Sequence, residues 1–403
     1  MKKTVPISMF LLWGASLWAE KPLRYVEFGF DSSVGFASNY IGIGDIFNAD
    51  QVVNLNLNTV PSGDFEVNAD LGMQVFFNMN FGEKFGLGFF AGVHSIVYQS
   101  LSHTFLKFLS QGNGDLRQYT ADITLGGSVF ADTGIKASVN IGKLKVGISP
   151  ALYVPILYMP KPAIQYRFDS VYDKLYLDVT ADVKAYSPIS LESLVGGSLD
   201  ISSGAIMEIL DAKGFDFSLN AEYALVPLFD VGGVVTHIPL MPAVLTHETH
   251  AAFHYRYDPD QDLLNSLLTG SFEFDTPELN DPVYSDDASF RVYRPLGFDF
   301  YVLFKPLRTN SVIIKPNIGF SLFTVYGEPC FNLGLEAQLR VRRLLTVRIG
   351  SFYQERIWRN QCNLGLNLRV FELDLGFGVQ SQDLKGILDI KGLGVSVGLR
   401  MGF

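Results

Sequence analysis

The residues with the most obvious capacity for chemistry lie in the segment "HETHAAFH", which carries His247, Glu248, His250 and His254. Zinc peptidases place two histidines four residues apart on a helical turn, with a glutamate directly after the first one. Here the first two histidines are only three residues apart. On a strand, His250 and His254 would share a face but lie about 13 Å apart, at about 3.3 Å per residue. We therefore expect polar side chains of a sheet here, with no metal and no cofactor.

Cys330 and Cys362 are the only cysteines, and an even number in an exported chain is compatible with a disulfide. If one strand separates the two strands that carry them, their backbones lie about 9.5 Å apart, at two strand spacings. A disulfide tolerates only about 7 Å between Cα atoms. The two side chains also fall on opposite faces, with Cys330 inward and Cys362 outward. A bond would require the strand ends to separate into loops, and both alternatives stay open.

Two pairs of carboxylates share strand faces, Glu66 with Asp70 and Asp216 with Glu222. Paired acids can perform acid–base catalysis, but a hydrated interior surface needs the same residue types. We find no G-x-S-x-G elbow, phosphate-binding loop or dinucleotide fingerprint between a strand and a helix. The sequence thus identifies no catalytic residue, and we expect that the protein is not an enzyme.

The elements that must position these residues are long alternating strands. From Phe65 to Phe81 every odd-numbered residue is apolar and most even-numbered residues are polar. A period of two places these sets on opposite faces of a strand. Soluble strands usually run for about five or six residues, whereas a tilted strand crosses a bilayer in about 9 to 11. The pattern therefore favours a strand with one face toward lipid and one toward water.

The same alternation recurs to the end of the chain. Fifteen segments show it: 65–81, 85–99, 119–141, 144–155, 162–171, 174–187, 214–225, 247–257, 296–306, 311–325, 330–341, 344–353, 361–370, 371–380 and 391–403.

The start of the chain resembles a secretory signal peptide. Lys2 and Lys3 precede an apolar stretch, and Ala19 offers a cleavage site, so residues 1–19 are expected to be removed. No later segment is apolar enough for a transmembrane helix, although 13% of residues are aromatic and the mean hydropathy is +0.21. The formal net charge of −10 argues against binding nucleic acid through a basic face.

Inside hydrocarbon, only helices and closed barrels satisfy their backbone hydrogen bonds. The sequence therefore predicts an all-β protein, a transmembrane antiparallel β-barrel over residues 61–403, with about 14 strands and a range of 12 to 16. Tight connections at 82–84, 142–143, 172–173, 342–343 and 370–371 predict one rim of short turns. Because the strand at Phe65 descends toward that rim, a further strand must precede it, and Val53 to Leu57 is the nearest candidate. The segment 226–245 is longer than this scheme allows for a turn.

The carboxyl-terminal "GVSVGLRMGF" resembles the signal that marks outer-membrane barrels for assembly, so we expect the barrel-assembly machinery as a partner. The whole chain, including "VEFGFDSSVGFASNYIGIGDIFNAD" and "GGVVTHIPLMPA", resembles the treponemal, FadL-like outer-membrane proteins. That resemblance implies a monomeric barrel in the cell outer membrane, in contact with its lipid, that admits long-chain fatty acids or other hydrophobic small molecules. It also implies an amino-terminal segment that plugs the lumen, for which we predict residues 20–60. The Asn-Pro-Ala element of well-studied transporters is replaced here by Phe47-Asn48-Ala49-Asp50.

A loop helix forms part of an outer hydrophobic site in the transporters that the chain resembles. In this chain Phe105 and Phe108 have helical spacing within Ser102 to Gly114 and are the candidate ligand-binding residues; packing against the barrel rim is the alternative. Two other functions remain open for the whole protein. One is a general diffusion porin, and the other is a structural or secretion-scaffold barrel without a small-molecule site.

Overall fold

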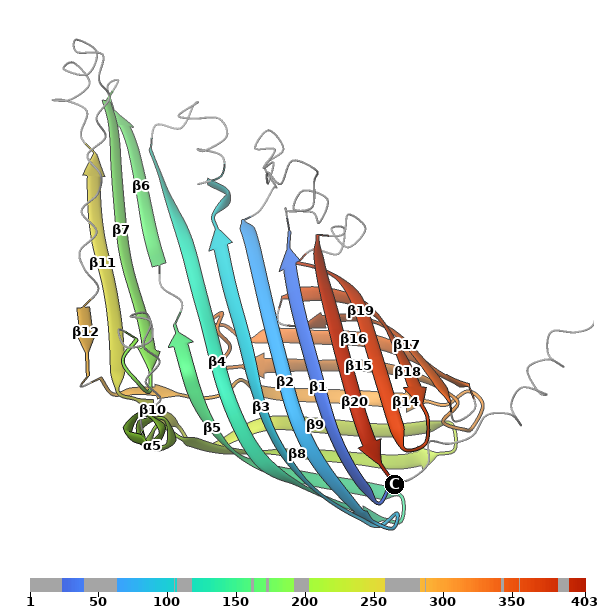
Figure 1. Cartoon of the computed structure of the whole chain (residues 1–403). Helices are drawn as coiled ribbons and strands as arrows, with labels where there is room; N and C mark the ends of the chain where they lie inside the picture. Colours follow the sequence, from blue (N-terminus) through green and yellow to red (C-terminus); the bar gives the residue numbers. More distant parts are fainter. Residues whose placement is uncertain are drawn as a thin grey trace, which may run out of the picture.

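The computed structural model describes residues 24–39, 64–104, 106, 118–160, 163–171, 174–191, 203–257, 283–286, 288–341, 344–354, 356–382 and 391–403. Among these residues, fourteen antiparallel strands pair in a closed ring (Figure 1). In ring order they are β1 (Val26–Ser38), β2 (Phe65–Phe81), β3 (Phe85–Leu101), β4 (Gln118–Ile141), β5 (Leu144–Met159), β8 (Gly214–Val226), β9 (Phe229–Met241), β14 (Leu296–Phe304), β15 (Val312–Leu322), β16 (Cys330–Val341), β17 (Leu345–Gln354), β18 (Ile357–Asn367), β19 (Phe371–Ser381) and β20 (Gly392–Gly402).

The ring closes where the first wall strand meets the last. β1 pairs with β2 from Val26 to Ser38 and with β20 on its other edge from Glu27 to Ala37. The backbone N–H of Tyr25 donates to the carbonyl oxygen of Phe403 at 2.8 Å, which extends the seam to the end of the chain. The wall therefore has no open edge among the described strands.

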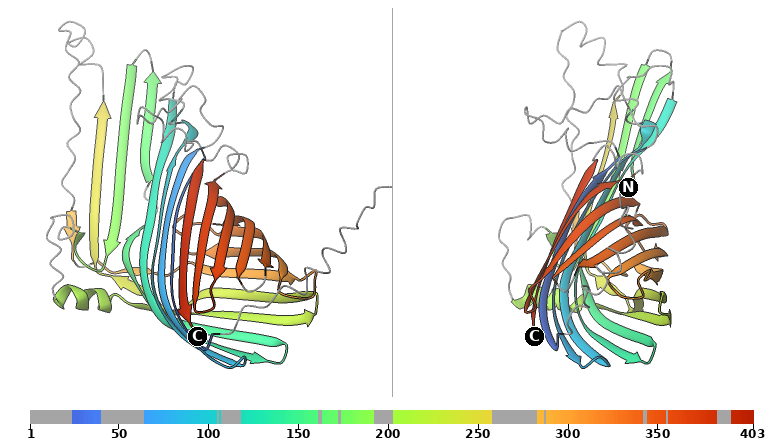
Figure 2. Two further views of the ribbon diagram at one scale, coloured as in Figure 1. Left: turned by 45° about the vertical axis from the view of Figure 1, so that its right-hand side comes forward. Right: turned by 90° about the vertical axis from the view of Figure 1, so that its right-hand side faces the viewer.

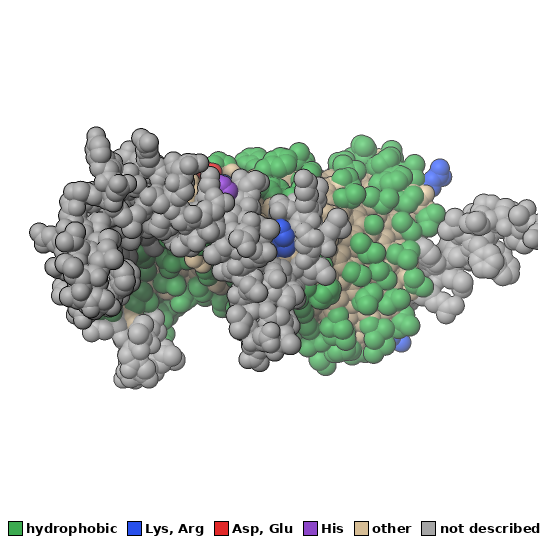
Figure 3. Space-filling model, turned by 90° about the horizontal axis from the view of Figure 1, so that it is seen from above, with side chains coloured by type: hydrophobic (Ala, Val, Ile, Leu, Met, Phe, Trp, Pro, Cys, Tyr) green, Lys and Arg blue, Asp and Glu red, His purple; other side chains and the backbone are tan. Residues whose placement is uncertain are grey.

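Alternation along each strand produces an apolar exterior and a polar interior. On β2, Leu71, Met73 and Val75 are exposed on the outside, whereas Asn68 is buried on the inside. No Lys, Arg, Asp or Glu occupies an outward position in the described parts of the wall strands. Viewed from above, apolar side chains cover the outer surface of the barrel (Figure 3). A continuous apolar surface of this kind is typical of contact with lipid, and the chain is a transmembrane β-barrel.

The connections divide the barrel into two unlike ends. We call the end with the tight connections the short-turn rim, and it also holds the carboxyl terminus (Figure 1). Gly82 and Gly142 adopt positive φ angles of 64° and 60° in two of its turns, a conformation that glycine adopts without strain. Among the described residues, the short-turn rim comprises 82–84, 142–143, 227–228, 305–311, 344 and 368–370.

The sheet branches away from the wall at the opposite end. The first part of β4 pairs with β6 (Ala163–Val171), which pairs with β7 (Lys174–Ser187), and β7 pairs with β11 (His247–Tyr257). β12 (Val283–Ser285) continues this sheet. We call β6, β7, β11 and β12 the side sheet; they rise beside the barrel mouth (Figure 2). Helix α5 (Ser203–Asp211) connects β7 to β8. In the described part of the chain, no helix is long and apolar enough to span a membrane.

The fold confirms the closed antiparallel barrel and the count of about 14 strands, and all fifteen alternating segments are strands. Three of them, β6, β7 and β11, lie in the side sheet instead of the wall. The turn expected at 172–173 joins β6 to β7 and lies outside the described residues. Two wall strands were not predicted. The segment from Phe229 to Met241, which was too long for a turn, is wall strand β9.

The structure corrects part of the expected amino-terminal plug. Val26–Ser38 lies in the wall as β1 because its backbone bonds to both β2 and β20, so the barrel begins well before residue 61. It is also the strand that precedes Phe65, in place of the predicted Val53 to Leu57. Residues 1–23 and 40–63 lie outside the described residues, and with them the signal peptide and the rest of the predicted plug.

A designed disulfide tests this seam. Ser32 and Val397 are paired Cα partners on the outward face of β1 and β20, and neighbouring pairs lie within the reach of a disulfide, about 4.4–6.8 Å between Cα atoms. In a Cys330→Ser, Cys362→Ser background, we expect Ser32→Cys and Val397→Cys to crosslink on mild oxidation, detected as a mobility shift on a non-reducing gel. The control pair, Ser32→Cys with Val395→Cys, is diagonal and should stay open. An uncrosslinked test pair would contradict the assignment of residues 26–38 to the wall.

Candidate lumen binding site

The candidate site is a cavity of about 380 Å³ in the barrel interior. Its walls come from strands far apart in the sequence, because the inward positions of β1, β2, β3, β4 and β16 converge there. Ile96, Phe130 and Pro295 supply apolar surface, and Asp70, His94 and Asn332 supply polar groups. The buried side-chain oxygen of Asn332 has no hydrogen-bond partner among the described residues. The cavity can therefore make both apolar and polar contacts with a small molecule.

Arg294 is the most highly connected charged residue of the cavity wall. Its Nε donates to Asp216 Oδ2 at 2.7 Å, its Nη2 donates to Asp216 Oδ1 at 2.6 Å, and its Nη1 donates to Asp132 Oδ2. All three side chains are buried. Burial alone would lower the pKa of Arg294, but the carboxylates of Asp216 and Asp132 raise it above its ordinary value. The guanidinium group stays charged and joins the segment before β14 to β4 and β8.

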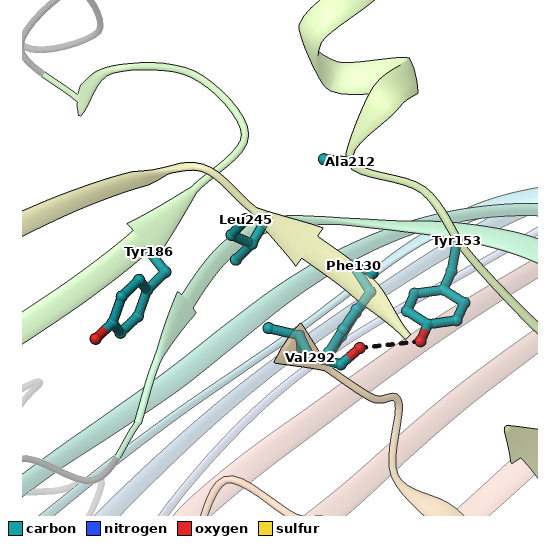
Figure 4. Close-up of a cluster of buried hydrophobic side chains, with 7 residues drawn as sticks. Phe130, Tyr153, Tyr186, Ala212, Leu245 and Val292 are labelled. Carbon is teal, nitrogen blue, oxygen red and sulfur yellow. Dashed lines mark hydrogen bonds between the residues drawn. The ribbon is translucent and has the colours of Figure 1, made fainter. Parts of the chain in front are cut away.

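A two-stranded ribbon packs at the barrel mouth above Arg294. β10 (Ala243–Leu245) pairs with β13 (Phe290–Val292), and we call these two strands the mini-sheet. Leu245 and Val292 are buried against Tyr153 and other apolar side chains of the wall (Figure 4). The Tyr153 hydroxyl donates to the Val292 carbonyl oxygen at 3.0 Å. Apolar packing and this hydrogen bond hold the mini-sheet against the wall where Phe130 lines both the buried cluster and the cavity.

A second ion pair crosses the inner face of the seam. Arg359 Nη2 on β18 lies 3.0 Å from Asp70 Oδ1 on β2, although β19, β20 and β1 separate these strands. At this level the three intervening strands carry the paired glycines Gly378, Gly394 and Gly35. A Cβ on Gly35 would lie 2.4 Å from Asp70 Oδ1. The glycines therefore leave the space through which Arg359 reaches Asp70.

The lumen becomes more strongly charged toward the short-turn rim. A cavity of about 330 Å³ there is lined by charged side chains of β1, β17, β19 and β20. Arg400 Nη1 lies 2.6 Å from Asp374 Oδ2, and Arg348 Nη2 lies 3.2 Å from Asp374 Oδ1. Arg400 also contacts Asp31 at 3.3 Å. These contacts define an interior surface on which basic and acidic side chains are paired.

The histidine segment is on the side sheet and outside the lumen. His250 Nε2 lies 2.9 Å from Asp182 Oδ1, and Glu248 pairs with Lys184 at 3.3 Å, so both residues make cross-strand contacts between β11 and β7. Among the described residues, no group of His, Cys, Asp and Glu has the arrangement of a metal site. The side chain of His254 lies outside the described part of the chain.

The other candidate residues have separate partners. Both carboxylate pairs point into the lumen, but Glu66 accepts a hydrogen bond from Tyr98 at 3.1 Å and Glu222 accepts one from Tyr301 at 3.0 Å. Asp70 and Asp216 are paired with the arginines described above. Phe105 and Phe108 lie outside the described residues.

Both cysteines are thiols in the structure, without a disulfide between them. Cys330 is buried on the inner face of β16, and Cys362 is exposed on the outer face of β18. β17 lies between these two strands, so the two cysteines are separated by two strand spacings, which is the separation that argued against a disulfide.

Sequence reasoning did not single out Arg294, Arg359 or His237. His237 has a positive φ angle of 55°, and its Nδ1 lies 2.9 Å from the Pro295 carbonyl oxygen, beside Arg294. Alternation gave the inward direction of Asp132 and Asp216, which was the only available signal for this cluster.

Comparison with solved structures found other β-barrels at low similarity. The P. putida toluene transporter TodX aligns over 97% of this chain and 94% of its own, with 10% identity and a TM-score of 0.46. The Ralstonia pickettii toluene transporter TbuX aligns over 95% and 90%, with 10% identity and a TM-score of 0.46. A Pseudomonas aeruginosa FadL homologue aligns over 94% and 90%, with 10% identity and a TM-score of 0.42. No protein-family model and no curated protein matches the chain.

Removal of the Arg294 side chain tests the cluster at the barrel mouth. Arg294→Met would leave Asp132 and Asp216 as unpaired buried carboxylates, and we expect a loss of about 3–5 kcal/mol in the free energy of unfolding. Denaturant unfolding in detergent measures this loss. Adding Asp132→Asn and Asp216→Asn should restore most of the stability, because the uncompensated charges are then absent. Unchanged stability of Arg294→Met would contradict a structural role for the cluster.

Proposed function

We propose that the protein is an outer-membrane transporter that admits hydrophobic small molecules, such as long-chain fatty acids, by passive transport. The observation that carries this proposal is the cavity in which apolar side chains of the barrel mouth adjoin polar groups of the lumen. Phe130 and Ile96 would contact the hydrocarbon chain of the transported molecule. The Asn332 side chain and the guanidinium groups of Arg294 and Arg359 would contact its polar head group. The apolar exterior places this cavity within a membrane-spanning wall.

The family resemblance adds finer elements to this proposal. A FadL-like barrel would be a monomer in the cell outer membrane, inserted by the barrel-assembly machinery after removal of residues 1–19. Phe105 and Phe108 would form an outer site for the ligand, and residues 40–60 would contribute to a plug.

A general diffusion porin is the second candidate function. The charged part of the lumen near the short-turn rim favours it. Arg348, Arg400 and Asp374 line the second cavity and suit passage of water and small polar solutes. Asp374 pairs with both arginines and Arg400 also pairs with Asp31, so side chains of both charge signs line this path.

Conductance and lipid retention together separate these functions. A transporter should show little steady ion conductance in planar bilayers, and native mass spectrometry should detect retained acyl chains. Steady conductance without bound lipid would favour the porin instead. If neither signal is present and another protein copurifies stoichiometrically, the barrel serves as a scaffold.

Replacement of Ile96 tests the proposed ligand contact. Ile96→Asn places an amide in the apolar part of the cavity, and we expect fatty-acid affinity to fall about tenfold, equivalent to about 1.4 kcal/mol. Titration with a fluorescent fatty acid measures the affinity. The matched variant Ile96→Leu keeps the apolar surface and should bind as the unaltered protein does. Equal affinity of both variants would contradict binding at this cavity.

A further inference from the structure

The short-turn rim carries basic residues around the barrel, although the chain as a whole is acidic with a formal net charge of −10. In its described turns the basic residues are Lys84, Lys143, Lys305, Arg308 and Arg369. A single carboxylate side chain, Glu83, is found in the same turns. Because consecutive short turns lie between successive strand pairs of the ring, the positive charges are spread along this rim.

Four of these side chains are unpaired with the rest of the described structure. Lys305 contacts Asp230, so its charge is neutralised within the barrel. Lys84, Lys143, Arg308 and Arg369 are exposed, and none of them has an ion-pair partner among the described residues. We call these four residues the basic ring. Their charges remain available to a partner outside the chain.

The basic ring lies directly beside the apolar exterior. Lys84 is flanked by Phe81 and Phe85, which are 58% and 43% exposed, and Lys143 is preceded by Ile141, which is 64% exposed. Long basic side chains next to an apolar belt extend toward the headgroup region while their aliphatic stems cover apolar surface. The ammonium and guanidinium groups are therefore at the level where lipid phosphates lie.

Two of the arginines occupy backbone positions that disfavour them. Arg308 and Arg369 have positive φ angles of 55° and 72°, where other turns of this rim use glycine. In this conformation the Cβ of an L-residue lies too close to the following carbonyl oxygen, which makes the conformation unfavourable. Glycine or asparagine would fit this backbone conformation better than arginine does. We therefore look for a function of the two arginine side chains.

Two of the described basic residues at the opposite end have carboxylate partners within the chain. Arg356 lies 3.1 Å from Glu328, and Lys213 lies 4.0 Å from Asp211. Arg291 at this end is exposed and has no ion-pair partner among the described residues, whereas four such cations lie at the short-turn rim.

We propose that the basic ring binds the anionic headgroups of phospholipids in the leaflet next to the short-turn rim. The phosphate oxygens accept charge-assisted hydrogen bonds from the lysine and arginine donors. A basic residue near an anionic membrane surface contributes about 1 kcal/mol, or about fivefold in affinity. This binding depends on the membrane-spanning exterior and is independent of the transported molecule.

Native mass spectrometry of the full chain from mixed micelles tests the proposal. Equal amounts of phosphatidylglycerol and phosphatidylcholine with identical acyl chains are supplied, and retained lipids are counted. We expect the unaltered protein to retain phosphatidylglycerol preferentially. In the variant Lys84→Gln, Lys143→Gln, Arg308→Asn, Arg369→Asn, this preference should fall at least about tenfold. Asparagine tolerates the left-handed conformation, so the variant should remain folded, as checked by its heat-dependent gel mobility.

A matched control variant removes the same number of positive charges from residues outside the short-turn rim. Lys184→Gln, Lys213→Gln, Arg291→Gln and Arg356→Asn again neutralise two lysines and two arginines, including one arginine with a positive φ angle. This control should keep the preference for phosphatidylglycerol. Equal retention of both lipids by the unaltered protein would overturn the proposal, as would an equal loss of preference in the two variants.

Discussion

The backbone hydrogen bonds of the wall are the constraint on which the rest of the structure depends. Hydrocarbon offers no water to a peptide group, so each membrane-spanning strand needs a bonded neighbour on both edges. The pairing of β1 with β20 meets this requirement where the first wall strand adjoins the last. Once the ring is closed, alternation assigns every side chain either to lipid or to the lumen, and the apolar exterior and polar interior both follow.

The strands with strong alternation could be predicted from sequence, but two wall strands could not. In β1, the inward positions include Gly29 and Gly35, and the outward position Ser32 is polar, so the period-two signal is weak. In β9, Gly232 and Gly233 occupy opposite faces, and His237 turns the backbone out of its regular conformation. Glycine has no side chain that would mark its position as apolar or polar, so it weakens the alternation, although it fits a crowded lumen well. Alternation also cannot tell a wall strand from one in the side sheet, since it reports only that two faces differ.

The candidate site was less accessible to sequence reasoning because it forms between distant segments. Alternation directs Asp132 and Asp216 inward, but their partner Arg294 lies in a long connection, 162 and 78 residues away. Nothing local to Arg294 indicates which strands it joins. The mini-sheet could not be predicted either, because strands of three residues are too short to show a recognisable alternation. The mini-sheet of the β9–β14 connection packs against the wall at the barrel mouth, whereas the resemblance assigned the filling of the lumen to the amino-terminal segment.

Lipid contact with the odd-numbered residues of β2 is the most direct consequence of a membrane-spanning wall. Nitroxide labels placed one at a time from Val67 to Met79 in the reconstituted protein, in a background without cysteine, would measure collision with oxygen and with a water-soluble nickel complex. We expect a period of two, with oxygen collisions dominant at odd positions and nickel collisions dominant at even positions. Equal access of the nickel complex to both sets would contradict it, because both faces of the strand would then be in water.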